Sequence, residues 1–124
     1  MKGYVGNIEE ITLKNKYFRK VVFTGTQMQL VVMCLKPNEA IGDEVHHGTD
    51  QFFRIEKGVA RVIFNEKEKH TVKAGGAIVV PAETYHNIIN ASKTKSLQLY
   101  TIYAPPHHPD KTVHKTKKDA EQHS

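Results

Sequence analysis

The sequence contains very little cysteine. Cys34 is the single cysteine of the 124-residue chain, so no disulfide can form within it. It lies inside the apolar run 30–35, and no neighbouring residue is placed to lower the pKa of its thiol. We therefore expect a buried core thiol rather than a catalytic nucleophile.

The sequence also lacks long apolar runs. No run approaches the roughly 18 residues that a membrane-spanning helix needs. Near the N-terminus, Gly3, Asn7 and Glu9 interrupt any apolar signal region. We therefore expect a cytoplasmic protein that has no membrane partner.

The excess of positive charge is small and scattered. Lysine and arginine total 18 against 13 acidic residues, which gives a formal net charge of +5. The lysines are spread along the chain, and no basic motif with interleaved aromatic residues appears. This pattern favours a small anionic metabolite as the partner, or no link between the charge and a partner, over nucleic acid.

From Tyr4 to Tyr103 the sequence has the texture of a β protein, without internal repeats. Short runs rich in Val, Ile, Phe, Tyr and Thr are separated by Gly, Asn, Asp, Lys or Pro. The expected strands cover residues 10–14, 18–24, 28–35, 52–56, 60–65, 69–72, 77–80, 85–89 and 96–103. Helical periodicity is absent before residue 115, after which Thr116 is suited to cap one short helical turn. Many short strands predict a sandwich or a barrel.

Alternation along two of these runs predicts polar side chains inside the barrel. Gln51 shares a face with Phe53 and Ile55, because successive strand residues point to opposite sides. His86 likewise shares a face with Ile88. Polar residues in line with inward-facing apolar ones indicate a site built into the interior.

Two histidine-bearing stretches carry the chemical signal. The second, residues 75–90, follows the pattern Gly-x5-Pro-x-Gly-x2-His-x3-Asn through Gly75, Pro81, His86 and Asn90. Glu83 takes the place of the middle glycine. The first stretch, residues 44–58, departs further from its usual pattern of a His-x-His pair followed by a glutamate and a glycine.

Aligned on Gly58, the first stretch reads Glu44-x-His46-x4-Gln51, so Gln51 stands where the glutamate is usual. The two stretches together resemble the paired motifs of the cupin superfamily. The resemblance covers roughly residues 28–103. The runs 50–56 and 99–106 are also similar to a small group of bacterial cupins labelled mannose-6-phosphate isomerase-like.

The resemblance implies an all-β fold, an antiparallel double-stranded β-helix or jelly-roll barrel. The barrel would span residues 1–106, and an irregular polar C-terminal tail, residues 107–124, would follow it. Cupins commonly dimerise through N-terminal or edge strands, so a homodimer is expected, with the apolar segment Tyr17–Phe23 as the candidate edge.

The resemblance also implies a divalent transition metal, Mn, Fe, Ni or Zn. The metal ligands that it implies are Glu44, His46, Gln51 and His86. Glu44 and His46 are two residues apart, so both point to the same side of a strand. An alternative register uses His47 and leaves Glu44 out.

The expected function is that of a metal-dependent enzyme acting on a small polar, carbohydrate-like or anionic metabolite, of the isomerase, lyase or oxygenase type. The alternative is a non-catalytic barrel that binds or senses a small ligand, which the neutral Gln51 favours. His107, His108 and His114 form a second site or fold over the barrel mouth, or else belong to a solvated tail. No catalytic residue is assigned.

Overall fold

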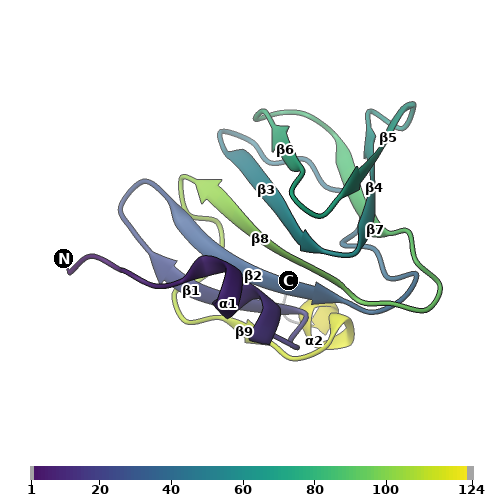
Figure 1. Ribbon diagram of the computed structural model, residues 1–124. Helices are drawn as coiled ribbons and strands as arrows, with labels where there is room; N and C mark the ends of the chain where they lie inside the picture. Colours follow the sequence, from purple (N-terminus) through teal and green to yellow (C-terminus); the bar gives the residue numbers. More distant parts are fainter. Residues whose placement is uncertain (1, 123–124) are drawn as a thin grey trace.

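Two antiparallel sheets face each other in the computed structural model, which describes residues 2–122 (Figure 1). The larger sheet has the strand order β6-β3-β8-β2-β1-β9, and the smaller has the order β5-β4-β7. The strands are β1 (Arg19–Thr24), β2 (Gln29–Leu35), β3 (Asp50–Lys57), β4 (Val59–Phe64), β5 (Glu68–Lys73), β6 (Ala77–Val80), β7 (His86–Asn90), β8 (Leu97–Ala104) and β9 (Val113–His114). This is the all-β jelly roll that the sequence predicts.

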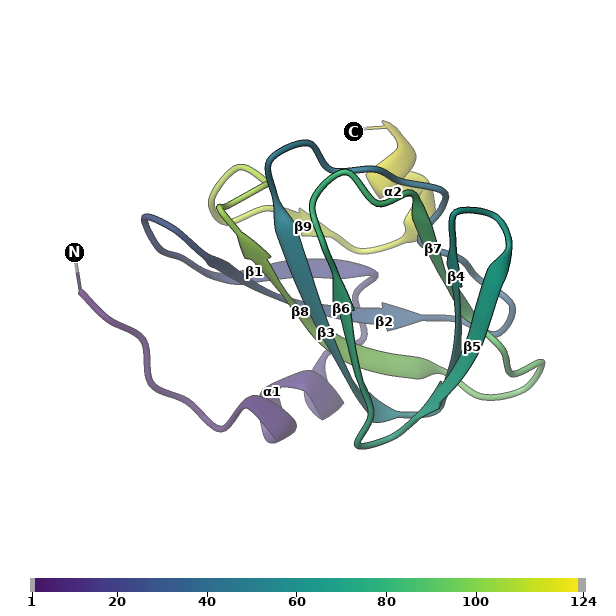
Figure 2. The same cartoon turned by 90° about the horizontal axis from the view of Figure 1, so that it is seen from above.

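Figure 2 shows the two sheets from above. The side chains of the hydrophobic core lie between them. On β3, Phe53 and Ile55 are buried while Arg54 between them is half-buried, so the predicted alternation is confirmed. On β7, Ile88 lies in the core between the two buried polar residues His86 and Asn90. The interior is therefore apolar at its centre and polar towards both ends of β7.

The prediction of a strand at residues 10–14 is wrong, because this segment forms helix α1 (Ile8–Lys14). Asn7 caps the helix by accepting a 3.0 Å hydrogen bond from the Glu10 amide. Glu10 and Lys14 form an ion pair of 2.6 Å one turn apart, and their charges suit the two ends of the helix dipole. Local capping and charge thus outweigh the β-type composition here.

The remaining predicted strands are confirmed, with ends that differ by a residue or two. Cys34 is buried as predicted, and burial raises the pKa of its thiol. Among residues 2–122, no helix is both long enough and apolar enough to cross a membrane. The cytoplasmic location stays a prediction.

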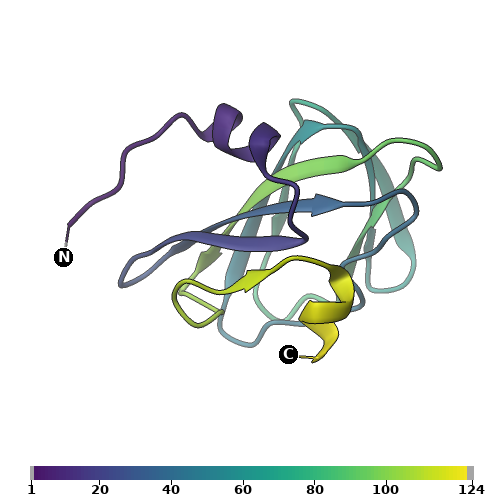
Figure 3. The same cartoon turned by 90° about the horizontal axis from the view of Figure 1, so that it is seen from below.

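The C-terminal segment, residues 105–122, folds back along β1 (Figure 3). β9 pairs with Arg19 and Lys20, and the Val21 amide donates a 2.9 Å hydrogen bond to the Thr112 carbonyl. Helix α2 (Lys117–Gln122) follows, and its Asp119 amide donates to the Thr116 hydroxyl at 3.1 Å. The predicted cap at Thr116 is confirmed.

β9 occupies part of the β1 edge that the sequence offers for dimerisation. The homodimer stays a prediction, and so does the domain boundary at residue 106. Residues 123 and 124 of the predicted tail lie outside the described residues.

Candidate metal centre

A short backbone bridge joins the two histidine-bearing stretches at the mouth of the barrel. The Glu44 amide donates to the His86 carbonyl, and the His86 amide donates to the Glu44 carbonyl, both at 2.8 Å. Directly opposed residues of an antiparallel pair place their side chains on the same face. The fold thus brings the first implied ligand of one stretch beside the histidine of the other.

Glu83 ties the loop that carries His46 to the loop before β7. Its amide donates to the His46 carbonyl at 2.9 Å, and its carboxylate accepts from the Gly48 amide at 2.7 Å. The backbone of Glu83 has φ 69°, a left-handed conformation that favours glycine. This explains why the family pattern has glycine at this position, and the carboxylate contacts compensate for the strain of the substitution.

His47 points away from the barrel interior. Its Nδ1 lies 2.6 Å from the Glu83 carboxylate, and its side chain is 79% exposed. His46, the preceding residue, is 7% exposed and lies inside. The alternative register through His47 is therefore wrong, since its imidazole faces solvent.

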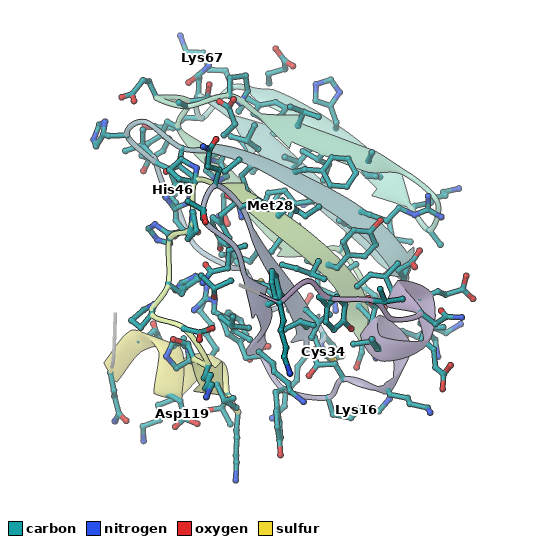
Figure 4. All side chains as sticks on the ribbon, turned by 90° about the vertical axis from the view of Figure 1, so that its left-hand side faces the viewer. Lys16, Met28, Cys34, His46, Lys67 and Asp119 are labelled. Atoms are coloured by element: carbon teal, nitrogen blue, oxygen red, sulfur yellow. The ribbon has the colours of Figure 1, made fainter. Side chains whose placement is uncertain are left out.

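Glu44, His46 and His107 each offer a ligand atom within 4.8 Å of the other two. The Glu44 carboxylate lies 3.9 Å from His46 Nε2, and the ring centroids of His46 and His107 are 4.5 Å apart. Figure 4 shows His46 beside the C-terminal segment that carries His107. We call these three residues the triad.

His86 and Gln51, the other two predicted ligands, adjoin the triad. The ring of His86 lies 5.5 Å from that of His46, and Gln51 pairs across the strands with Tyr103, whose ring is 5.8 Å from His46. The full set of predicted ligands is thus placed at one end of the interior, although only Glu44 and His46 belong to the triad. The ligand set stays a prediction.

Three of these side chains carry a buried polar atom that has no hydrogen-bond partner among the described residues. The atoms are His46 Nε2, Gln51 Oε1 and His86 Nε2. Buried polar atoms are nearly always paired, because an unpaired one costs about 1–3 kcal/mol. Such atoms gathered at one place indicate a ligand that would satisfy them.

The neighbours of Gln51 and His86 orient these atoms. His86 Nδ1 lies 2.9 Å from the Thr84 carbonyl, which only accepts, so Nδ1 carries the proton and Nε2 presents a lone pair. Gln51 Nε2 donates to the Thr101 hydroxyl at 3.0 Å, which leaves its Oε1 oxygen as the free acceptor. Both side chains are therefore held in the orientation that a metal ligand requires.

Burial keeps the imidazoles of the site in the neutral form that binds metals. Burial, together with the neighbouring imidazoles of His107 and His86, lowers the pKa of His46 to about 4. Burial also lowers the pKa values of His86 and His107. The pKa of the Glu44 carboxyl is raised by burial, against which Arg19 acts to lower it.

His107 is the metal-binding candidate that sequence reasoning did not assign. The buried Gln29 of β2 positions it, because its Oε1 accepts from the amides of His107 and His108, at 3.1 and 3.0 Å. His107 stacks on Tyr103 with 5.2 Å between ring centroids, and it is exposed to solvent. Of the readings left open for the tail histidines, folding over the barrel mouth is the one that the structure supports.

The Cupin domain family matches residues 31–103, which is more than half of the chain, and the chain belongs to this family.

An uncharacterized protein of Acanthamoeba polyphaga mimivirus is 51% identical over 108 residues, which cover 86% of this chain and 68% of the viral protein. The uncharacterized protein YrkC of Bacillus subtilis (strain 168) is 46% identical over 124 residues, which cover 96% of this chain and 66% of YrkC. The chain thus spans about two thirds of the length of both relatives.

Among solved structures, the protein BH2720 from Bacillus halodurans superimposes with a TM-score of 0.94 and 40% identity. The match covers 98% of this chain and 95% of that protein. The resemblance therefore includes the N-terminal helix and the C-terminal segment as well as the barrel. The closer likeness to the mannose-6-phosphate isomerase-like group stays a prediction.

Proposed function

We propose that this cupin binds a divalent transition metal at the barrel mouth and uses it in a reaction on a small polar, carbohydrate-like or anionic metabolite. The metal is Mn, Fe, Ni or Zn, and the ligands are Glu44, His46, Gln51 and His86, with His107 as a further ligand from the C-terminal segment. The observation that carries this proposal is the gathering of unpartnered buried atoms, His46 Nε2, Gln51 Oε1 and His86 Nε2, beside the triad.

The donor set suits such a metal. Imidazole nitrogen, one carboxylate and a neutral amide oxygen match the preferences of the late first-row divalent ions. When bound, the metal supplies Lewis-acid polarisation of a carbonyl or stabilisation of an enediolate. With a single carboxylate, a divalent site keeps a net positive charge, which favours an anionic or enolisable ligand.

The chain's own residues provide a sheltered place for that chemistry. Tyr103 is buried between Gln51 and the imidazoles, and burial raises the pKa of its hydroxyl, so this group stays protonated. Its hydroxyl oxygen lies 3.3 Å from His108 Nε2. The hydroxyl is therefore suited to orient a bound molecule by hydrogen bonding rather than to act as a base.

A second candidate function is a barrel that binds a small ligand without turnover. Gln51 favours it, because an amide is a weaker metal ligand than the usual glutamate and its nitrogen is already engaged with Thr101. The two functions differ in one measurement. Ligand-induced thermal stabilisation without product formation supports the binding barrel, and turnover that is lost in His86→Ala supports the enzyme.

Elemental analysis of the purified protein tests the metal site. We expect about one transition-metal ion per chain, and loss of that metal in His46→Ala and His86→Ala. His70→Ala is the matched control, because His70 is an exposed histidine that pairs with Glu68 on β5, outside the site. Wild-type protein that is metal-free, and that also fails to bind added Mn, Fe, Ni or Zn, would contradict the proposal.

A further inference from the structure

Arg19 is a buried guanidinium at the start of β1, and it forms no ion pair with a carboxylate of residues 2–122. The residue is 7% exposed, and its Nη1 donates a hydrogen bond to His114 Nδ1 at 3.2 Å. Its Nε is buried without a hydrogen-bond partner. Among residues 2–122, no carboxylate oxygen lies within 4.0 Å of it, since Arg54 is the only arginine that forms an ion pair there.

A buried arginine in this state is costly. Guanidinium stays protonated at any physiological pH, and a buried charge without an ion-pair partner in direct contact destabilises a protein. The positive charge acts on the surrounding groups. Burial and then Arg19 lower the pKa values of His107 and His108, and Arg19 opposes the rise that burial causes in the pKa of Glu44. The site therefore retains a fixed positive charge that a bound anion would neutralise.

Arg19 and two members of the triad, Glu44 and His107, border the same cavity. Its volume is about 420 Å³, and it lies between the start of β1, the loop of Glu44 and the C-terminal segment. Arg19, Glu44 and His107 line it, while Phe18 and Ile41 supply apolar walls. This volume falls within the roughly 300–1,000 Å³ typical of small-molecule sites.

We propose that this cavity binds a small organic acid, whose carboxylate pairs with Arg19 while the other end of the molecule reaches the triad. A carboxylate fits because it is planar and can accept from two guanidinium N–H groups at once, and Nε is the donor that lacks an acceptor. The contact with the triad rests on the proposed metal function. The pairing with Arg19 does not, because the guanidinium keeps its charge whether or not a metal is bound.

The class of ligand that pairs with Arg19 can be tested on protein stripped of metal with a chelator. Acetate, glycolate, pyruvate and malonate are titrated by calorimetry, with inorganic phosphate and pyruvamide as the comparison ligands. We expect at least one organic acid to bind, phosphate to bind more weakly and the neutral pyruvamide not to bind. Tighter binding of phosphate than of every organic acid would overturn the choice of carboxylate.

The variant Arg19→Gln should weaken binding of the organic acid roughly tenfold to a hundredfold, since a hydrogen bond to a charged group contributes about 1.5–3 kcal/mol. Arg61→Gln is the matched control, because Arg61 is exposed on β4 and its replacement changes the net charge equally. Arg19→Lys, which retains the charge, should fall between wild type and Arg19→Gln. The melting temperature of each variant establishes that it is folded.

Two readouts separate this inference from the metal proposal. If Arg19-dependent acid binding is present but the protein binds no metal, the inference stands and the proposed metal function fails. If metal is bound through His46 but no organic acid binds, or Arg19→Gln binds as wild type does, the inference is wrong and the metal function is unaffected.

Discussion

The two ends of the barrel treat their buried polar groups in opposite ways. At the closed end, the Asn90 amide donates to the carbonyls of Leu35, Lys36 and Lys95 at 2.9–3.2 Å. Gln98 likewise donates to the last carbonyls of α1 and beyond, including Leu13 at 2.9 Å. At the open end, the unpartnered buried side-chain atoms of the described residues gather on Arg19, His46, Gln51 and His86.

This difference separates structural from functional polar residues. Asn90 and Gln98 stabilise the fold by donating to the carbonyls of Leu35 and Asn15, which would otherwise be buried without a donor. The unpartnered atoms at the open end stabilise nothing in the free protein. Violations of the pairing rule are expected at functional sites, where a ligand restores the missing interactions.

Substitution at the closed end should have the largest effect on stability. Asn90→Ala removes the donor to three carbonyls, of which that of Leu35 is buried, so we expect the free energy of unfolding to fall by about 2 kcal/mol. Urea unfolding of the metal-free protein measures this change. An effect below about 1 kcal/mol would show that water replaces the amide, and the contrast between the two ends would be lost.

Substitution at the open end should instead lower metal affinity. His86→Gln preserves a donor for the Thr84 carbonyl and removes only an unpartnered nitrogen, so the unfolding free energy should change by less than about 1 kcal/mol. Metal affinity should drop at least tenfold, measured by competition with a chromogenic chelator. Equal loss of stability in His86→Gln and Asn90→Ala would mean that His86 is a structural residue.

The metal-free protein should lose stability on acidification. Unfolded histidine has a pKa near 6.5, whereas the folded-state pKa of His46 is lowered to about 4. Between these values the unfolded chain binds more protons, so stability is complete above about pH 6.5 and falls as pH drops towards 4. His46 alone should contribute about 1 kcal/mol per pH unit. Glu44, whose pKa burial raises, opposes this trend by favouring the folded state at low pH.

The pH effect can be assigned by comparing variants. His46→Gln should flatten the dependence of the urea midpoint on pH, whereas His70→Gln, at an exposed site, should leave it unchanged. A dependence that is identical in wild type and His46→Gln would show that the imidazole of His46 is not shielded from water.

The smallest expected effect concerns the loop that Glu83 holds. Glu83→Ala and Glu83→Gly both remove the contacts with His47 and Gly48, but only alanine must keep φ 69° with a β-carbon. We expect alanine to be less stable than glycine by about 1 kcal/mol. Equal midpoints in thermal unfolding would show that backbone strain is not significant at this position.

Sequence reasoning predicted what depends on local pattern. Alternation along 52–56 placed Phe53 and Ile55 in the core, and motif spacing brought Glu44, His46 and His86 to one end of the barrel. The strand expected at residues 10–14 was wrong because composition was weighed above the Asn7 cap. That cap was visible in the sequence and would have indicated a helix.

The contributions of His107 and Arg19 depend on contacts between distant parts of the chain. His107 lies beside Glu44 and His46 because Gln29, on a strand far earlier in the sequence, anchors the C-terminal segment. Arg19 faces the cavity because β9 folds back beside it and supplies His114. Neither pairing has a local sequence signal, since a lone glutamine or arginine on a strand carries no such information.

Anomalous diffraction from a crystal grown with Mn or Zn would show whether a metal binds at the barrel mouth. We expect an anomalous peak at the open end, coordinated by His46 Nε2 and by Glu44, with His86 Nε2 facing it. The exposed His70–Glu68 pair provides an internal comparison, because it offers the same atom types without burial. A peak only at that exposed pair, or none at the open end, would contradict the account.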